Sequence, residues 1–187
     1  MLISDMKTHN GMRPQDIVVL LKILSMEENW LNKDLSTTLF ISNSEISESL
    51  NRSMIARLIN TDKRKVAVNS LFEFLVYGLK YSFPAEIGIL VRGVPTAHSS
   101  PVLKDFFVFD TNYVWASPAG HVKGIAVQPL YPNQPLAALA DQSLYDKLAL
   151  IDAVRVGRNR ERNKAVELLE HLLKNTYAPE YHQAQSR

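Results

Sequence analysis

LNKDLSTTLFISNSEISESLNRSMIARLI, residues 31–59, is the stretch that decides the fold. Its apolar residues repeat at helical spacing in two groups, Leu35 and Leu39 and then Ile46, Leu50, Met54 and Leu58. Two helices with one apolar face each pack at a steep angle when a short turn joins them. The stretch therefore predicts a helix-turn-helix, with Ile41 in the turn.

The second helix of this pair has a clear start signal and a polar outer face. Ser42 can cap it, and Glu45 three residues later completes the pattern of a capping box. Short polar side chains on the outer face can hydrogen-bond to the edges of DNA bases. The alternative is a solvated helix in a protein-interaction domain. The candidate DNA-reading residues are Asn43, Ser44, Ser47, Glu48, Asn51 and Arg52.

This stretch resembles the helix-turn-helix of winged-helix bacterial transcriptional regulators, the MarR-like group in particular. The resemblance covers about residues 13–84 and implies a winged-helix fold, DNA binding and a homodimer. Two features depart from the family pattern: Phe40 stands where Gly is usual, and the reading helix starts with Glu45 and Glu48 instead of basic residues. The matching positions are Leu35-Ser36, Leu39, Ile41-Ser42, Ile46-Ser47, Leu50 and Leu58-Ile59.

The flanking segments complete an N-terminal domain over residues 12–84. Pro14 opens a helix that is expected to end near residues 26–29, and Ser70 caps another that Pro84 stops. A wing hairpin belongs after Ile59, but the segment is short enough to form only a loop. Its basic run can contact DNA phosphates or be an ordinary exposed turn. That run is Lys63, Arg64 and Lys65.

A second region, residues 85–175, is expected to serve dimerisation or sensing. We expect a strand near residues 87–91, no regular structure over residues 92–101, a β-hairpin from residues 113–116 and 122–127, and two C-terminal helices. The fragments RGVPTAH, GIAVQPLYP and LALIDAVRVGRNRER look like parts of an uncharacterised family of bacterial regulators. Residues 1–11 and 176–187 are expected to be flexible tails.

The densest positive charge lies in RVGRNRERNK, residues 155–164. It could bind phosphate of DNA or of a nucleotide effector. The alternative is a solvated helix junction, or arginines paired with Asp141, Asp146 and Asp152. The candidate phosphate-binding residues are Arg155, Arg158, Arg160, Arg162 and Lys164.

Composition and motifs argue against other classes. The chain has 187 residues, a net charge of +2 and no cysteine, which fits a reducing cytoplasm. It has no apolar run long enough to span a membrane. Arg92, His98 and His121 lie near Gly and Pro turns, but they show no triad or metal-ligand spacing. We therefore expect no enzyme activity, metal or cofactor.

Together these patterns predict an α+β, mainly helical protein with a small β-hairpin. Its expected function is that of a cytoplasmic, dimeric, sequence-specific regulator that reads double-stranded DNA with the helix starting at Asn43. The main alternative is a protein-interaction module, such as the antitoxin that partners a toxin. A further alternative is an enzyme centred on Arg92 and His98.

Overall fold

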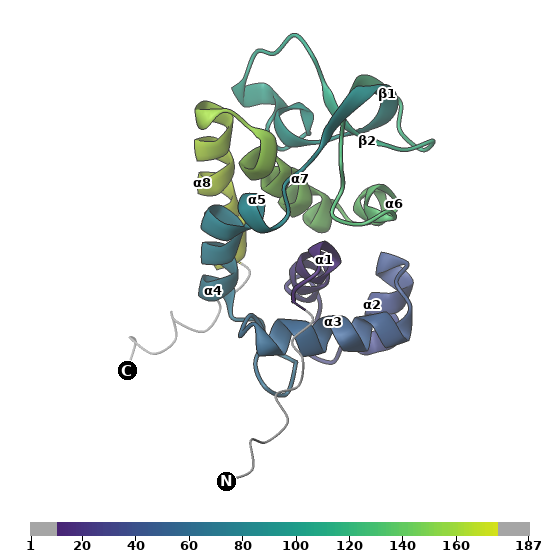
Figure 1. Ribbon diagram of the computed structural model, residues 1–187, viewed down its shortest axis with the longest axis vertical. Coiled ribbons are helices and arrows are strands. Elements are labelled where there is room, and N and C mark those ends of the chain that lie inside the picture. The colour runs from purple at the N-terminus through teal and green to yellow at the C-terminus, as the bar shows by residue number, and fades with distance from the viewer. Residues whose placement is uncertain (1–10, 176–187) are drawn as a thin grey trace.

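The computed structural model describes residues 11–175, and its fold is α+β and mainly helical, as the sequence predicts. The sheet lies at one end of the long axis and α3 lies across the other end (Figure 1). The tails predicted for residues 1–11 and 176–187 lie, apart from Gly11, outside the described residues. In chain order the elements are α1 (Pro14–Ile23), α2 (Asn32–Leu39), α3 (Asn43–Ile55), α4 (Val68–Glu73), a π-helical turn η1 (Phe74–Gly78), α5 (Leu79–Ser82), β1 (Ile87–Pro95), two 3-10 turns η2 (Ala97–Ser99) and η3 (Lys104–Phe106), β2 (Tyr113–Ala116), β3 (Val122–Val127), α6 (Gln134–Ala140), α7 (Gln142–Val156) and α8 (Asn159–Asn175).

Helix α1 is the central helix of the fold. Pro14 occupies its first turn, as predicted, but the helix ends at Ile23, before the expected end near residues 26–29. Residues 16–21 are all buried, because α1 contacts α2 and α3 as well as α7. Figure 1 shows α1 between α3 and the sheet-bearing end of the molecule. A helix buried on all sides supplies a core for both ends of the chain.

Helices α2 and α3 form the expected helix-turn-helix. Phe40 ends α2 in the left-handed conformation (φ 55°, ψ 40°), which glycine adopts at less cost. Ser42 caps α3, because its Oγ accepts from the backbone N–H of Glu45 at 3.3 Å. The Glu45 carboxylate does not return to the cap and instead accepts from Arg52 and Gln15. The predicted capping box is therefore only half formed.

The helix expected from Ser70 to Pro84 begins earlier and changes its winding. α4 starts at Val68, and η1 inserts a π-helical turn before α5 ends at Ser82. The predicted apolar side is present, since Leu71, Leu75 and Leu79 are fully buried.

The small sheet is built around β1. β1 pairs antiparallel with β2 and with β3, while β2 and β3 pair with each other in parallel and close the sheet. The strands at residues 113–116 and 122–127 have the predicted bounds, but they do not form the predicted hairpin, because they pair in parallel and each is antiparallel to β1. β1 continues to Pro95, and η2 follows it, so the expectation of no regular structure over residues 92–101 is wrong.

Two glycines allow the strands to approach this closely. A Cβ at Gly93 would lie 2.0 Å from the carbonyl oxygen of Trp115, and a Cβ at Gly120 would lie 1.9 Å from the carbonyl carbon of Gly93. No side chain fits at either position without moving the backbone. Close packing at Gly93 explains why a strand continues through a segment rich in Gly and Pro.

Asp152 of α7 fixes the sheet to the helices. It is fully buried and accepts hydrogen bonds from Thr96 Oγ1 at 2.9 Å, Trp115 Nε1 at 2.6 Å and Arg155 Nη1 at 2.8 Å. These donors come from the residue that follows β1, from β2 and from α7 itself. A buried carboxylate is tolerated when its oxygens are satisfied in this way.

Polar contacts also join α1 to the start of α7. Lys22 forms an ion pair of 2.7 Å with Asp141. Lys147 donates to Ser25 Oγ at 2.8 Å and to Ser143 Oγ at 2.6 Å. Burial lowers the pKa of Lys147. The N-terminal helices and the α7 helix are thus tied together by side chains as well as by the apolar core.

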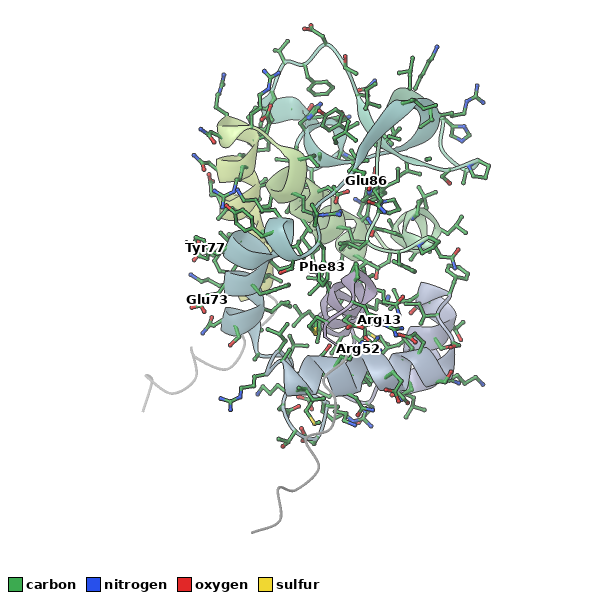
Figure 2. All side chains as sticks on the ribbon, viewed as in Figure 1. Arg13, Arg52, Glu73, Tyr77, Phe83 and Glu86 are labelled. Atoms are coloured by element: carbon green, nitrogen blue, oxygen red, sulfur yellow. The ribbon has the colours of Figure 1, made fainter. Side chains whose placement is uncertain are left out.

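A buried ion pair links α1 to α3. Asp16 is fully buried and accepts from Arg52 Nε at 2.8 Å and Nη2 at 2.7 Å. Arg52 Nη2 also lies 2.6 Å from a Glu45 carboxylate oxygen. The Arg13 backbone N–H completes the shell of Asp16 at 2.7 Å. Figure 2 shows Arg52 and Arg13 between α1 and α3.

We predict that Arg52→Ala lowers the free energy of unfolding by about 3–5 kcal/mol, because it leaves the Asp16 carboxylate buried without its partner. Arg13→Ala is the matched control. Arg13 also pairs with Glu45, at 3.2 Å, but its side chain is 53% exposed. Its loss should cost less than about 1 kcal/mol. Urea unfolding followed by circular dichroism measures both values, and equal losses would show that burial of the Asp16 pair has no special weight.

Candidate nucleic-acid interface

The outward face of α3 is polar and accessible. Asn43, Ser44 and Glu48 are exposed, and α3 lies across the end of the molecule away from the sheet (Figure 1). Ile55, in the last turn, is 47% exposed and adds an apolar group. Among the predicted DNA-reading residues, these three polar ones have side chains that an approaching surface can meet directly.

Ser47 and Asn51 are half-buried and already engaged. Ser47 Oγ accepts from Asn32 Nδ2 at 3.1 Å, which ties α3 to the first turn of α2. Asn51 Oδ1 accepts from Lys63 Nζ, which ties α3 to the loop that follows it. Both side chains lie at the border of the polar face, and each has part of its hydrogen-bonding capacity used within the protein.

Arg52 lies away from that face. Its side chain is 8% exposed, because it turns inward to the buried Asp16 carboxylate. The carboxylates of Asp16 and Glu45 both accept hydrogen bonds from Arg52 and raise its pKa above the ordinary value, although burial alone would lower this pKa. The prediction that Arg52 faces DNA is therefore wrong, and its role is structural.

The loop after α3 is a closed, ordered turn in the place of a wing. An isolated β-bridge pairs Ile59 with Val66. Between them, Asn60 Oδ1 accepts from the backbone N–H of Arg64 at 2.9 Å and of Lys65 at 2.8 Å. The Asn60 N–H donates to the Lys65 carbonyl at 2.9 Å. One side chain therefore fixes the backbone of the basic run.

The three basic residues of this loop, residues 60–65, have different settings. Lys63 has a positive φ of 60° and reaches Asn51. Arg64 lies over the ring of Trp30, with its guanidinium carbon 4.7 Å from the ring centre, and donates to the Trp30 carbonyl. Lys65 is exposed. Stacking and hydrogen bonding hold the Arg64 charge beside α3 instead of leaving it in free solution.

A small hollow of about 190 Å³ lies between the loop and the two helices. Its lining combines Asn32 and Ser47 with Lys63, Arg64 and Trp30. The sequence patterns gave no prediction for Asn32, Trp30 or Asn60. The role of Asn60 could have been predicted from its position, because the side chain of Asn at the start of a short turn often accepts from backbone N–H groups further along the chain.

The second basic segment, residues 155–164, does not form one cluster. Arg155 has a 2% exposed side chain, which pairs with Asp152 and donates to the Phe83 carbonyl at 3.0 Å. Its predicted role in phosphate binding is therefore wrong. Arg162 is half-buried and donates to the Val76 carbonyl at 3.0 Å. The two arginines tie α7 and α8 to the segment of residues 68–83.

The remaining basic residues of that segment are more accessible. Arg158 and Arg160 are exposed, on either side of the start of α8. Lys164 pairs with Glu167 at 2.8 Å and lies 4.6 Å from the ring centre of Phe106. Two arginines at the α7–α8 junction are therefore exposed, whereas Lys164 is already paired within the protein.

The side chains of Arg92, His98 and His121 do not assemble into a catalytic group. Arg92 lies on β1 in register with Lys123 of β3, and His121 is exposed. His98 lines a separate hollow, in which Arg92 takes no part. The enzyme alternative required Arg92 and His98 in one pocket, and this arrangement does not provide it.

Within residues 11–175, no group of three His, Asp or Glu side chains is placed to share a metal ion. No helix in the same part of the chain combines the length and apolar character needed to cross a membrane. Comparison of the chain with protein-family models, with curated proteins and with solved structures found no match in any of the three.

Proposed function

We propose that this protein is a transcriptional regulator of the winged-helix, MarR-like type that binds double-stranded DNA in the cytoplasm. The observation that carries the proposal is the contact between the polar face of α3 and the basic loop 60–65, made by Lys63 and Asn51. Proteins that bind DNA specifically combine groups that read base edges with groups that hold phosphates. Here the two kinds of group belong to adjacent elements.

In the proposed complex, α3 enters the major groove with its first turn leading. Residues at the start of a recognition helix contact base edges in helix-turn-helix proteins. Asn43 can pair with adenine, Ser44 can donate or accept, and Glu48 can accept from the amino group of cytosine. These side chains are exposed and short, so they can approach the bases closely.

The loop supplies the affinity in this proposal. Lys63, Arg64 and Lys65 contact phosphates beside the groove, while Glu48 adds a negative charge to α3 itself. Each phosphate contact contributes about −0.9 to the slope of log affinity against log salt concentration. A protein with three such contacts per subunit has a modest slope and depends strongly on each of them.

We predict that replacing both Lys63 and Lys65 with Ala weakens binding to every DNA sequence equally. The negative slope of log affinity against log salt concentration should become less steep by about two units per binding subunit, one unit for each lost contact. Fluorescence anisotropy with DNA from upstream of the coding region, and with scrambled DNA, measures both quantities over a salt series.

The matched control is the double replacement of Lys104 and Lys123 with Ala. It removes the same charge from exposed positions in η3 and β3, outside the proposed interface. It should leave the salt slope unchanged. The assignment of roles is overturned if both double variants weaken binding alike, or if the Lys63 and Lys65 variant changes the preference between the two DNA molecules.

Asn60→Ala tests whether order in the loop contributes to binding. It keeps every charge but removes the acceptor for the N–H groups of Arg64 and Lys65. The expected result is about threefold to tenfold weaker DNA binding, the equivalent of about 1 kcal/mol, with nearly the same salt slope. Hydrogen exchange should show faster exchange of those two amides. Faster exchange with unchanged affinity would exclude a role for loop order.

A protein-interaction module is the second candidate, and one surface favours it. Phe40 is 54% exposed in a strained backbone conformation, and Asn133 Nδ2 donates to its carbonyl at 3.2 Å. Asn133 directly precedes α6, and two leucines of that helix, Leu136 and Leu139, are 44% and 51% exposed. Phe40→Gly separates the two candidates, because it removes the exposed ring and relieves the strain. DNA binding should survive this change, whereas docking of a partner protein should be lost.

The proposal includes a homodimer. Two-fold symmetry in the protein matches the two half-sites of a palindromic operator. Tyr77 and Tyr81 are 69% and 75% exposed on the η1–α5 segment and offer aromatic surface for such contact. Figure 2 shows Tyr77 on the outer edge of the molecule. Light scattering of the purified protein, with and without DNA, measures the stoichiometry.

A further inference from the structure

A hollow of about 540 Å³ lies between the loop residues 108–111 and the junction of α7 and α8. This size is in the range of small-molecule sites. The hollow is at the end of the molecule that carries the sheet, because Ile87 of β1 and Ile125 of β3 also line it. It is therefore separate from α3 and the loop 60–65.

Aromatic rings form one wall of this hollow. His98 lies between two rings, with its centre 4.7 Å from that of Phe109 and 4.6 Å from that of Tyr113. His98 Nε2 is 3.0 Å from the Thr111 carbonyl, which holds the imidazole in place. All four residues line the hollow. Stacked rings in a concave site offer π faces to a flat or cationic ligand.

The opposite wall carries an acidic group without a partner. Glu161 lines the hollow from the first turn of α8, and its Oε2 atom is buried with no hydrogen-bond donor among the described residues. Asp110, on the loop beside Phe109, is a second carboxylate of the lining and is exposed to water. A buried carboxylate oxygen without a donor is costly, so a ligand that brings an N–H group gains from meeting it.

One basic residue lines the hollow, and its charge does not exclude a cation. Arg158 is the basic residue of the lining, and it is exposed to water, which screens its charge. Asp110 and Arg158 are both exposed to water, so the half-buried carboxylate of Glu161 is the charge that the hollow shelters. Phe106 of the nearby η3 turn gives a precedent, because the Lys164 ammonium lies 4.6 Å from the centre of its ring.

The loop wall has the character of a cover. Val108 is completely exposed, and Phe106 is 50% exposed, although both are apolar. Val108 lines this hollow and the adjacent one of similar size, which Phe106 and Arg158 also line. Apolar side chains held in water at the rim gain by closing over an apolar ligand.

We propose that this hollow binds a small organic cation: an amine or amidine with N–H donors for Glu161, carried on a flat apolar body that stacks against the aromatic wall. The Glu161 carboxylate selects positive charge, and the rings and Val108 select the apolar body. This inference does not depend on DNA binding, so either proposal can fail without the other.

The test uses benzamidine as the probe, with the full chain. Benzyl alcohol has a similar apolar body without charge, and benzoate has the opposite charge. Titrations followed by protein NMR should show saturable shifts at His98, Phe109 and Tyr113 with benzamidine, and at least tenfold weaker binding of the other two compounds. Equal binding of benzyl alcohol, or no saturable shift with benzamidine, overturns the proposal.

Glu161→Gln keeps the size of the side chain and removes its charge. It should weaken benzamidine binding at least tenfold, while Glu167→Gln, on the exposed side of the same helix, should leave it unchanged. Circular dichroism checks that both variants keep the fold. If Glu161→Gln unfolds the chain, Phe109→Ala takes its place and should weaken binding by a similar factor. Unchanged binding in the folded variant overturns the role assigned to that wall.

Discussion

The fold depends on one guanidinium group placed between two carboxylates. Arg52 bridges Asp16 of α1 and Glu45 of α3, and Asp16 is fully buried. Removing the Arg52 and Asp16 charges from water is costly, and this arrangement offsets the cost only through its two-point geometry and the additional backbone donor from Arg13. Because α1 also contacts α7, the same interaction sets the direction of α3 relative to the rest of the chain.

This use of charge has a consequence for the surface of α3. Arg52 is the basic residue of that helix, and it points inward, so Glu48 carries the charge that remains on the outward face. The basic groups next to that face belong to the loop 60–65, where Asn60 orders the backbone and Trp30 supports Arg64. In the proposed DNA complex, base reading and phosphate binding are therefore divided between two elements. The loop has to be ordered because its charges act from outside the helix.

Periodic burial could be predicted from the sequence, whereas distant polar partners could not. Helical spacing predicts which sides of α2 and α3 are buried, and the structure has both helices with those sides buried. The residues concerned are Leu35, Leu39, Ile46 and Leu50. The spacing within α3 does not predict that the Arg52 side chain points inward, because its partner Asp16 is 36 residues away. The extension of β1 was missed for a similar reason: Gly93 reads as a turn residue, but it is required by the approach of Trp115.

The two walls of the proposed cation site differ in how they can respond to a ligand. α7 is anchored by Asp152, which accepts from Thr96, directly after β1, and from Trp115 of β2, so the junction wall is fixed to the sheet. The opposite wall consists of residues 108–111, which belong to no helix or strand and include the fully exposed Val108. Few buried contacts make such a segment the least costly part to move. Closure over a bound cation should therefore come from this loop, while the helices that support α3 keep their positions.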